Sequence, residues 1–256
     1  AEGDYARAQT LLSRLIEESE ESAEKKAERR ESLEKNAARA KDILEKESSE
    51  GIEKRAAQEQ AELLYYVAER VFLRYEDMFR LSFNAATLGR EHGKASLQKA
   101  MKELLASLGF DLAQEMRATA VRLERFLAKR GKELQETLAK TLSEGERDFS
   151  FGVEATEFDF ALSFPAAFAD VEPQVFAKEL ALFKSPAQFF EKGGSKIMAE
   201  ALKERLRPMV SAYLEREGAR LEERVLSGSR AVFEAALAHV RREAQGYYEG
   251  HRAALA

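Results

Sequence analysis

The chain of 256 residues contains no cysteine, which excludes disulfide bonds and thiolate metal sites. A cysteine-free sequence is typical of a reducing compartment, so we expect the cytoplasm. Proline is also scarce, because there are only four and all of them lie at or after Pro165. The residues before Pro165 therefore contain no obligatory helix breaker, and long helices can form there.

Long apolar runs are missing as well. No run approaches the roughly 18 residues that a membrane-spanning helix requires, and the polar opening AEGDYARAQT has no signal-peptide pattern. The first residue is not methionine, so we expect a processed product or a piece of a larger protein. The net charge of −5, with the two signs interspersed, argues against a nucleic-acid partner.

The residues that are present favour helices. Hydrophobic residues make up 45% and charged residues 34%, and Ala, Glu, Leu, Lys and Arg dominate. This composition is typical of long helices and coiled coils. The sequence therefore predicts an all-α fold: an elongated antiparallel helical bundle with long helices and an irregular, phenylalanine-rich tip.

Apolar spacing divides the chain into three parts of one continuous bundle: outgoing helices over 1–144, a hydrophobic tip over 145–194, and returning helices over 195–256. The first helix is expected from Asp4 to Ser49. Glycines are expected to mark the breaks that follow, at Gly51, Gly109 and Gly228.

Motifs for catalysis or metal binding are not found. GREHGKAS at 89–96 resembles a phosphate-binding loop, but one residue is missing between its glycines and Ala95 replaces the required hydroxyl. The three histidines are scattered, and no Glu-x-x-His pair suggests a di-metal bundle. We expect His239 to be a surface or hydrogen-bonded bundle residue. The sequence predicts no catalytic residue, metal ligand or cofactor in this chain.

The tip raises the main question, because ten of the sixteen phenylalanines lie between Phe149 and Gly194. One interpretation is a local core in which Phe158, Phe160 and Phe164 fold back on the bundle. A second is an edge strand, since EFDF alternates as a strand does. A third is membrane contact, in which several phenylalanines insert into lipid together. The candidate membrane-contact residues are Phe158, Phe160, Phe164, Phe168, Phe183, Phe189 and Phe190.

Charge does not help the membrane interpretation. The same segment carries seven acidic residues and three lysines. Because anionic headgroups attract basic clusters, this tip would have to depend on hydrophobic insertion.

The order of the parts and two local segments resemble the helical neck and trunk of bacterial dynamin-like GTPases. FKSPAQFFEKGGSKIMAEAL at 183–202 is similar to the start of their returning trunk helix, and GFDLAQEMRATAVRLERFL at 109–127 to their outgoing helix. The resemblance implies a stalk that connects a GTPase domain to a bilayer. It also implies GTP and Mg²⁺ for a parent protein, whose GTPase domain this chain lacks. No lipid-binding residue is transferred by motif, so the seven phenylalanines are named on physical grounds.

The leading hypothesis is therefore a membrane-contacting stalk of a tethering, fusion or remodelling protein, at the inner face of the plasma membrane. Its expected partners are a lipid bilayer, the GTPase domain of the same parent polypeptide and a second copy of the chain. By itself the chain is not expected to be an enzyme. The alternative is a soluble interaction scaffold whose phenylalanine cluster binds a partner or self-associates.

Overall fold

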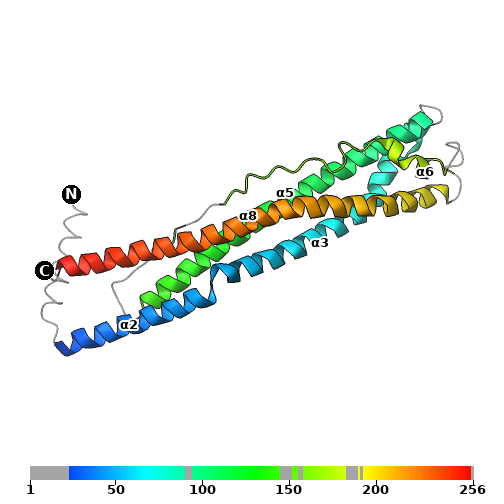
Figure 1. Cartoon of the computed structure of the whole chain (residues 1–256). Coiled ribbons are helices and arrows are strands. Elements are labelled where there is room, and N and C mark those ends of the chain that lie inside the picture. Colours follow the sequence, from blue (N-terminus) through cyan, green and yellow to red (C-terminus); the bar gives the residue numbers. More distant parts are fainter. Residues whose placement is uncertain are drawn as a thin grey trace, which may run out of the picture. The chain divides into compact units, whose positions relative to one another are not determined.

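Regular structure is helical throughout the part of the chain that the computed structural model describes, namely residues 23–89, 94–144, 152–154, 158–182, 190 and 193–254. No strand occurs among these residues, which confirms the predicted all-α bundle. The helices are α2 (Ala23–Lys46), α3 (Ser49–Ser82), α4 (Ala85–Gly89), α5 (Lys94–Leu142), the 3-10 helix η1 (Pro173–Phe176), α6 (Ala177–Leu180) and α8 (Gly194–Ala254) (Figure 1).

The described residues fall into two compact units. Unit 1 takes those within Ala1–Lys54, Phe126–Phe158 and Gly228–Ala256, and unit 2 takes those within Arg55–Arg125 and Asp159–Ser227. Helices α3, α5 and α8 each contribute residues to both units.

Unit 1 is held by a small apolar core. Its buried members come from α2, the C-terminal part of α5 and the C-terminal part of α8, and are Ala40, Leu134, Leu138, Ala236 and Val240. Polar contacts close the outside of this core. Asn36 Nδ2 donates to the Glu144 carbonyl at 2.6 Å, and Arg39 Nη1 lies 2.6 Å from the Glu144 carboxylate.

In unit 2, α3 runs antiparallel to α5. Arg74 Nη1 lies 2.6 Å from Asp111 Oδ1, and one turn earlier Arg70 Nη1 lies 3.2 Å from Glu115 Oε2. Higher residue numbers on α3 thus meet lower numbers on α5, and α5 begins at the end of the unit where α3 stops.

Helix α3 is antiparallel to α8 as well. Gln60 Nε2 donates to the Gly218 carbonyl at 2.9 Å, and the Tyr75 hydroxyl donates to the Ala199 carbonyl at 2.9 Å. The beginning of α8 therefore lies at the same end of unit 2 as the beginning of α5.

Side-chain caps define two helix boundaries more accurately than glycine does. The sequence predicts a break at Gly51, but Gly51 lies inside α3, and its N–H donates to Ser48 Oγ at 3.3 Å. Ser48 is thus the cap at which α3 begins. Similarly, Asn84 Oδ1 accepts the N–H groups of Ala86 and Thr87 at 2.9 and 3.0 Å, so α4 begins there.

Two further predicted glycine breaks are wrong. Gly109 lies within α5, and Gly228 lies within α8. A lone glycine costs a helix only about 1 kcal/mol relative to alanine, which packing of a long amphipathic helix easily offsets. Figure 1 draws α5 and α8 as continuous helices. Of the predicted helix from Asp4 to Ser49, residues 4–22 lie outside the described part.

Candidate functional site

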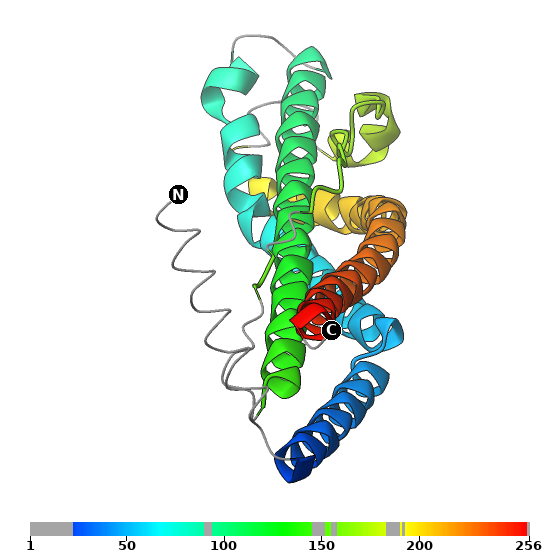
Figure 2. The same cartoon turned by 90° about the vertical axis from the view of Figure 1, so that its left-hand side faces the viewer.

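The phenylalanine-rich segment lies alongside helices of unit 2. Residues 159–182, here called the strap, run antiparallel to α5 (Figures 1 and 2). Near its start, the Phe160 N–H donates to Glu124 Oε1 at 2.7 Å. Further along, the Ala167 N–H donates to the Gly109 carbonyl at 3.4 Å. The strap thus lies along α5 before it reaches η1 and α6.

The strap turns its phenylalanines inward. Phe160, Phe164, Phe168 and Phe176 are all buried, with exposed fractions of 5%, 2%, 5% and 0%. Each buried ring contributes roughly 1.5–3 kcal/mol of hydrophobic stabilisation. Between them, Ala161, Ser163, Pro165 and Ala166 face solvent. Between Phe160 and Phe168 the strap is therefore amphipathic, with aromatic side chains buried and mostly small residues exposed.

Three successive carbonyl groups of the strap are held by side chains of α5 and α8. The Ser163 carbonyl accepts from Arg220 Nη1 at 3.4 Å, the Phe164 carbonyl from Arg117 Nη2 at 3.5 Å, and the Pro165 carbonyl from the Tyr213 hydroxyl at 2.8 Å. We call Arg117, Tyr213 and Arg220 the clasp. It replaces the backbone hydrogen bonds that a helix would have made for this segment.

A buried carboxylate orders the α8 part of the clasp. Glu217 is only 2% exposed, and its carboxylate accepts from Arg216 Nε at 2.9 Å and from Arg220 Nη1. Burial raises the pKa of Tyr213 to about 12, and the nearby Glu217 carboxylate adds to the effect. The hydroxyl therefore stays protonated over the physiological range and remains a donor to the strap.

Gly109 is a point at which the backbones of α5 and the strap approach closely. A Cβ at this position would lie 3.1 Å from the Ala167 nitrogen and 3.2 Å from the Phe168 nitrogen. Since both are backbone atoms, a side chain here would require the strap to move. Gly109 was expected to end a helix, but it lies within α5, where the absence of a side chain leaves room for the strap backbone.

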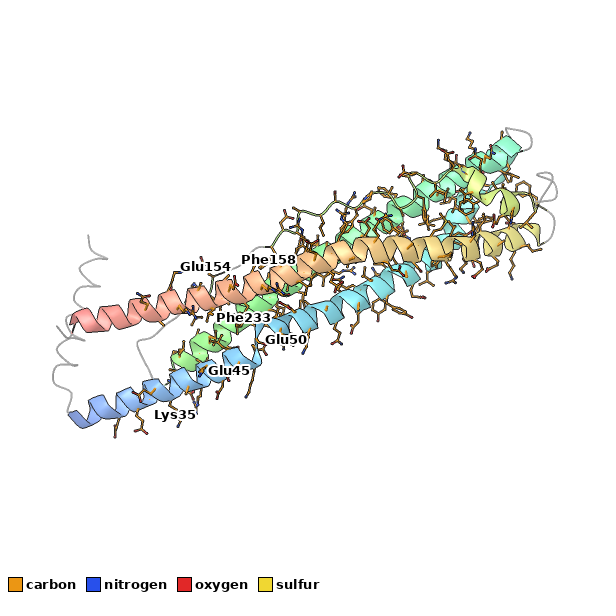
Figure 3. The ribbon with its side chains drawn as sticks, viewed as in Figure 1. Lys35, Glu45, Glu50, Glu154, Phe158 and Phe233 are labelled. Atoms are coloured by element: carbon orange, nitrogen blue, oxygen red, sulfur yellow. The ribbon has the colours of Figure 1, made fainter. Side chains whose placement is uncertain are left out.

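The part of the segment in unit 1 is held by different residues. His239 is buried, and its Nε2 lies 2.7 Å from the Gly152 carbonyl, which agrees with the expectation of a hydrogen-bonded bundle residue. Glu154 accepts from Arg242 at 3.0 Å and lies beside α8 in Figure 3. Phe158, the last residue of this part, is half-buried.

Unit 2 exposes large apolar side chains near the end where α5 and α8 begin. Leu81 precedes the last residue of α3, and Ile197 lies in the first turn of α8; they are 75% and 60% exposed. Leu182 follows α6, and Phe190 precedes α8 by four residues, with exposed fractions of 49% and 51%. We call these four residues the apolar end.

The seven predicted phenylalanines therefore divide into four groups. Phe160 and Phe164 are buried beneath the strap, as the local-core interpretation expects, while its third member, Phe158, is half-buried; Phe168, outside that interpretation, is buried too. Phe190 is half-exposed at the apolar end. Phe183 and Phe189 lie outside the described residues. Membrane contact by the three buried rings would require the strap to leave α5 and α8.

Sequence reasoning did not identify the clasp. Arg117 and Arg220 have the pattern of ordinary helix-surface residues, and Tyr213 lies on the buried apolar stripe of α8, so nothing in the sequence shows that these three residues bind the strap. Gly109 did carry a signal, because a glycine inside a strong helical pattern often marks close approach of another backbone.

No metal centre is found in the described part of the chain, where no three His, Asp or Glu residues gather closely enough to hold an ion. A cavity of about 440 Å³ in unit 1 is lined by α2, the start of α3 and α5. Its apolar floor includes Ile43 and Ile52, and its charged lining residues are Lys46, Glu47, Arg130 and Glu133. The balanced charges favour neither an anionic nor a cationic ligand.

None of the helices in the described part combines the length and the hydropathy needed to cross a bilayer.

Comparison with curated proteins finds one distant relative. Dynamin-like protein A of Bacillus subtilis (strain 168) is 28% identical to this chain over 190 residues. The alignment covers 73% of this chain but only 15% of the relative, so the chain spans a small part of that protein's length. No protein-family profile and no solved structure matches the chain. This chain is thus an all-α sequence with distant homology to a bacterial dynamin-like protein.

Proposed function

We propose that this chain is the helical stalk of a dynamin-like protein and that it contacts a membrane through unit 2. The parent protein would tether, fuse or remodel membranes with a GTPase domain that binds GTP and Mg²⁺ outside this chain. The distant homology to Dynamin-like protein A supports the family, and the order of helices supports the stalk. In this proposal the chain works at the inner face of the plasma membrane.

The apolar end is the single observation that carries membrane contact. Leu182, Phe190 and Ile197 present large side chains to solvent near the beginning of α8. Phe183 and Phe189 are the chain neighbours of Leu182 and Phe190, so the sequence adds two more aromatic residues to this part of the chain. Inserting one such side chain into lipid contributes roughly 1.5–3 kcal/mol, so several give reversible attachment.

Vesicle flotation with the double variant Leu182→Ser/Phe190→Ser tests this function. We expect binding to fall at least about tenfold, since two inserted side chains are lost and 1.4 kcal/mol corresponds to a factor of ten. Leu73→Ser is the matched control, because Leu73 is 77% exposed on α3 but lies more than two turns before the helix end. Unchanged flotation of the double variant would refute contact through the apolar end.

A second candidate is a protein-interaction scaffold that self-associates or binds a partner. The exposed side chains of Tyr65, Tyr66 and Leu73 along α3 favour it. This function predicts that Leu73→Ser weakens self-association or partner binding, measured by sedimentation and cross-linking, while the apolar-end variant does not.

A further inference from the structure

The strap and the helices beneath it are held in different ways. Helices α5 and α8 span Lys94–Leu142 and Gly194–Ala254, and each satisfies its backbone by its own hydrogen bonds. Between Phe160 and Ala167, by contrast, the strap is attached through side chains of α5 and α8 and one backbone bond to Gly109. Removing the strap would leave the backbone bonds of both helices intact.

Several attachments of the strap are long. The bonds from Arg220 to Ser163, from Arg117 to Phe164 and from Ala167 to Gly109 measure 3.4, 3.5 and 3.4 Å. Typical N–H···O distances are about 2.7–3.2 Å, so these bonds lie at the weak end of the range.

The strap also contains a strained residue. Ala161 has a φ of 50°, a left-handed conformation that alanine rarely adopts, and its N–H is held by the Asp159 carboxylate at 2.7 Å. Strain of this kind persists only when surrounding contacts impose it. Detaching the strap would let Ala161 relax.

We propose that the strap is a detachable cover that stores Phe160, Phe164 and Phe168 in water and releases them to a bilayer. This regulation rests on the proposed membrane function. In water, release would expose the buried apolar rings of the strap, so the strap stays closed. Beside a bilayer the rings pass from one apolar environment to another, and the hydrophobic penalty for opening disappears. The clasp then sets how readily the strap opens.

A side chain at Gly109 tests whether the strap detaches as a unit. In Gly109→Leu the new side chain would clash with the backbone of Ala167 and Phe168. The helix itself should not suffer, because leucine is a better helix former than glycine. We expect amide hydrogen exchange over residues 159–182 to become at least about tenfold faster, with helical circular dichroism preserved. Gly246→Leu is the control, since nothing lies within 4 Å of a Cβ at Gly246.

Two results would overturn the proposal that the strap can detach as a unit. One is loss of the helical signal in Gly109→Leu but not in the control, which would make the strap an integral part of the bundle. The other is unchanged exchange of the strap amides in a folded Gly109→Leu protein.

A covalent lock tests whether lipid binding needs the release. Because the chain has no cysteine, Ser163→Cys/Arg220→Cys can be joined selectively by a bis-maleimide long enough to span an arginine side chain. The same variant capped with N-ethylmaleimide is the matched control. On vesicles of neutral and anionic lipid, we expect the locked protein to bind at least about tenfold more weakly than the capped one.

Equal binding of the locked and capped proteins would show that lipid binding does not require release of the strap. Membrane contact would then be assigned to the apolar end alone. Absence of binding in the locked, capped and unmodified proteins would instead refute the proposed membrane function. The hydrogen-exchange result in water is independent of lipid, so the two failures are distinguishable.

Discussion

The Tyr213 hydroxyl donates to the Pro165 carbonyl at 2.8 Å, which makes it the shortest of the three clasp bonds. Tyr213→Phe removes this donor and keeps the buried ring. We expect the free energy of unfolding to fall by about 0.5–1.5 kcal/mol, since a neutral hydrogen bond is lost. Amide hydrogen exchange over residues 159–182, measured by mass spectrometry, should become faster by the factor that corresponds to this loss of free energy.

Tyr75→Phe is the matched control for this prediction. Its hydroxyl also donates to a backbone carbonyl in unit 2, that of Ala199 at 2.9 Å, but the acceptor belongs to α8. The control should lose similar stability without changing exchange of the strap. Equal acceleration in both variants would mean that Tyr213 supports the unit in general.

Two glycines of α8 offer a second prediction. Gly246→Ala should raise the free energy of unfolding by about 0.5–1 kcal/mol, because alanine is the better helix former and nothing lies within 4 Å of the added Cβ. Gly218→Ala should gain less, because its Cβ would lie 3.0 Å from Leu64 Cδ1. Urea unfolding of the two variants measures the difference, and equal gains would contradict the packing argument.

Helical spacing was sufficient to predict the fold class. On α3, for example, Val67, Val71 and Tyr75 recur at helical spacing, and all three are buried. The positions of the helix breaks were harder to predict. Glycines were expected to mark them, whereas Ser48 and Asn84 cap the helices that follow the breaks. A cap depends on which N–H groups a side chain reaches, and the sequence does not display that.

The candidate site was less predictable. The spacing Phe160, Phe164, Phe168 places the rings on one face of either a helix or an extended chain, so it could not decide what that face contacts. Tertiary contacts decide it, since the clasp residues come from α5 and α8, about 50 residues away on either side. Only the glycine at position 109 hinted at a backbone neighbour.

In unit 1, His239 and Glu154 should differ in their effect on stability. His239 is 7% exposed and Glu154 is 63% exposed at its side chain, although they lie 3.2 Å apart. His239→Ala leaves the Gly152 carbonyl without its partner and should cost about 1–3 kcal/mol. Glu154→Gln removes the exposed ion pair with Arg242 and should cost less than about 1 kcal/mol.

Thermal unfolding at several salt concentrations distinguishes these contributions. The cost of Glu154→Gln should shrink as salt rises, because exposed charges are screened. The cost of His239→Ala should persist, since it comes from the loss of a buried imidazole and its hydrogen bond to the Gly152 carbonyl, which salt does not screen. A larger effect for Glu154→Gln than for His239→Ala would contradict the assignment of His239 as the main attachment of Gly152.

Asp111 makes the stability of unit 2 depend on pH. Burial raises the pKa of the Asp111 carboxyl, the Arg74 guanidinium opposes the shift, and the neighbouring Glu115 adds to it. Because the folded protein then holds a proton that the unfolded chain has released, the Asp111 contribution to stability falls as pH rises. The fall begins near the unfolded value, about 3.9, and continues until pH exceeds the raised folded pKa.

Asp111→Asn removes this titration while keeping a carbonyl oxygen for Arg74. Urea unfolding of the unmutated chain and the variant between pH 3.5 and 7 measures the difference in their free energies of unfolding. The titration of all other groups largely cancels in this difference. We expect the unmutated chain to lose stability relative to the variant as pH rises through this window. A difference that stays constant would mean that the Arg74 guanidinium, 2.6 Å from Asp111 Oδ1, fully offsets the cost of burying the charge.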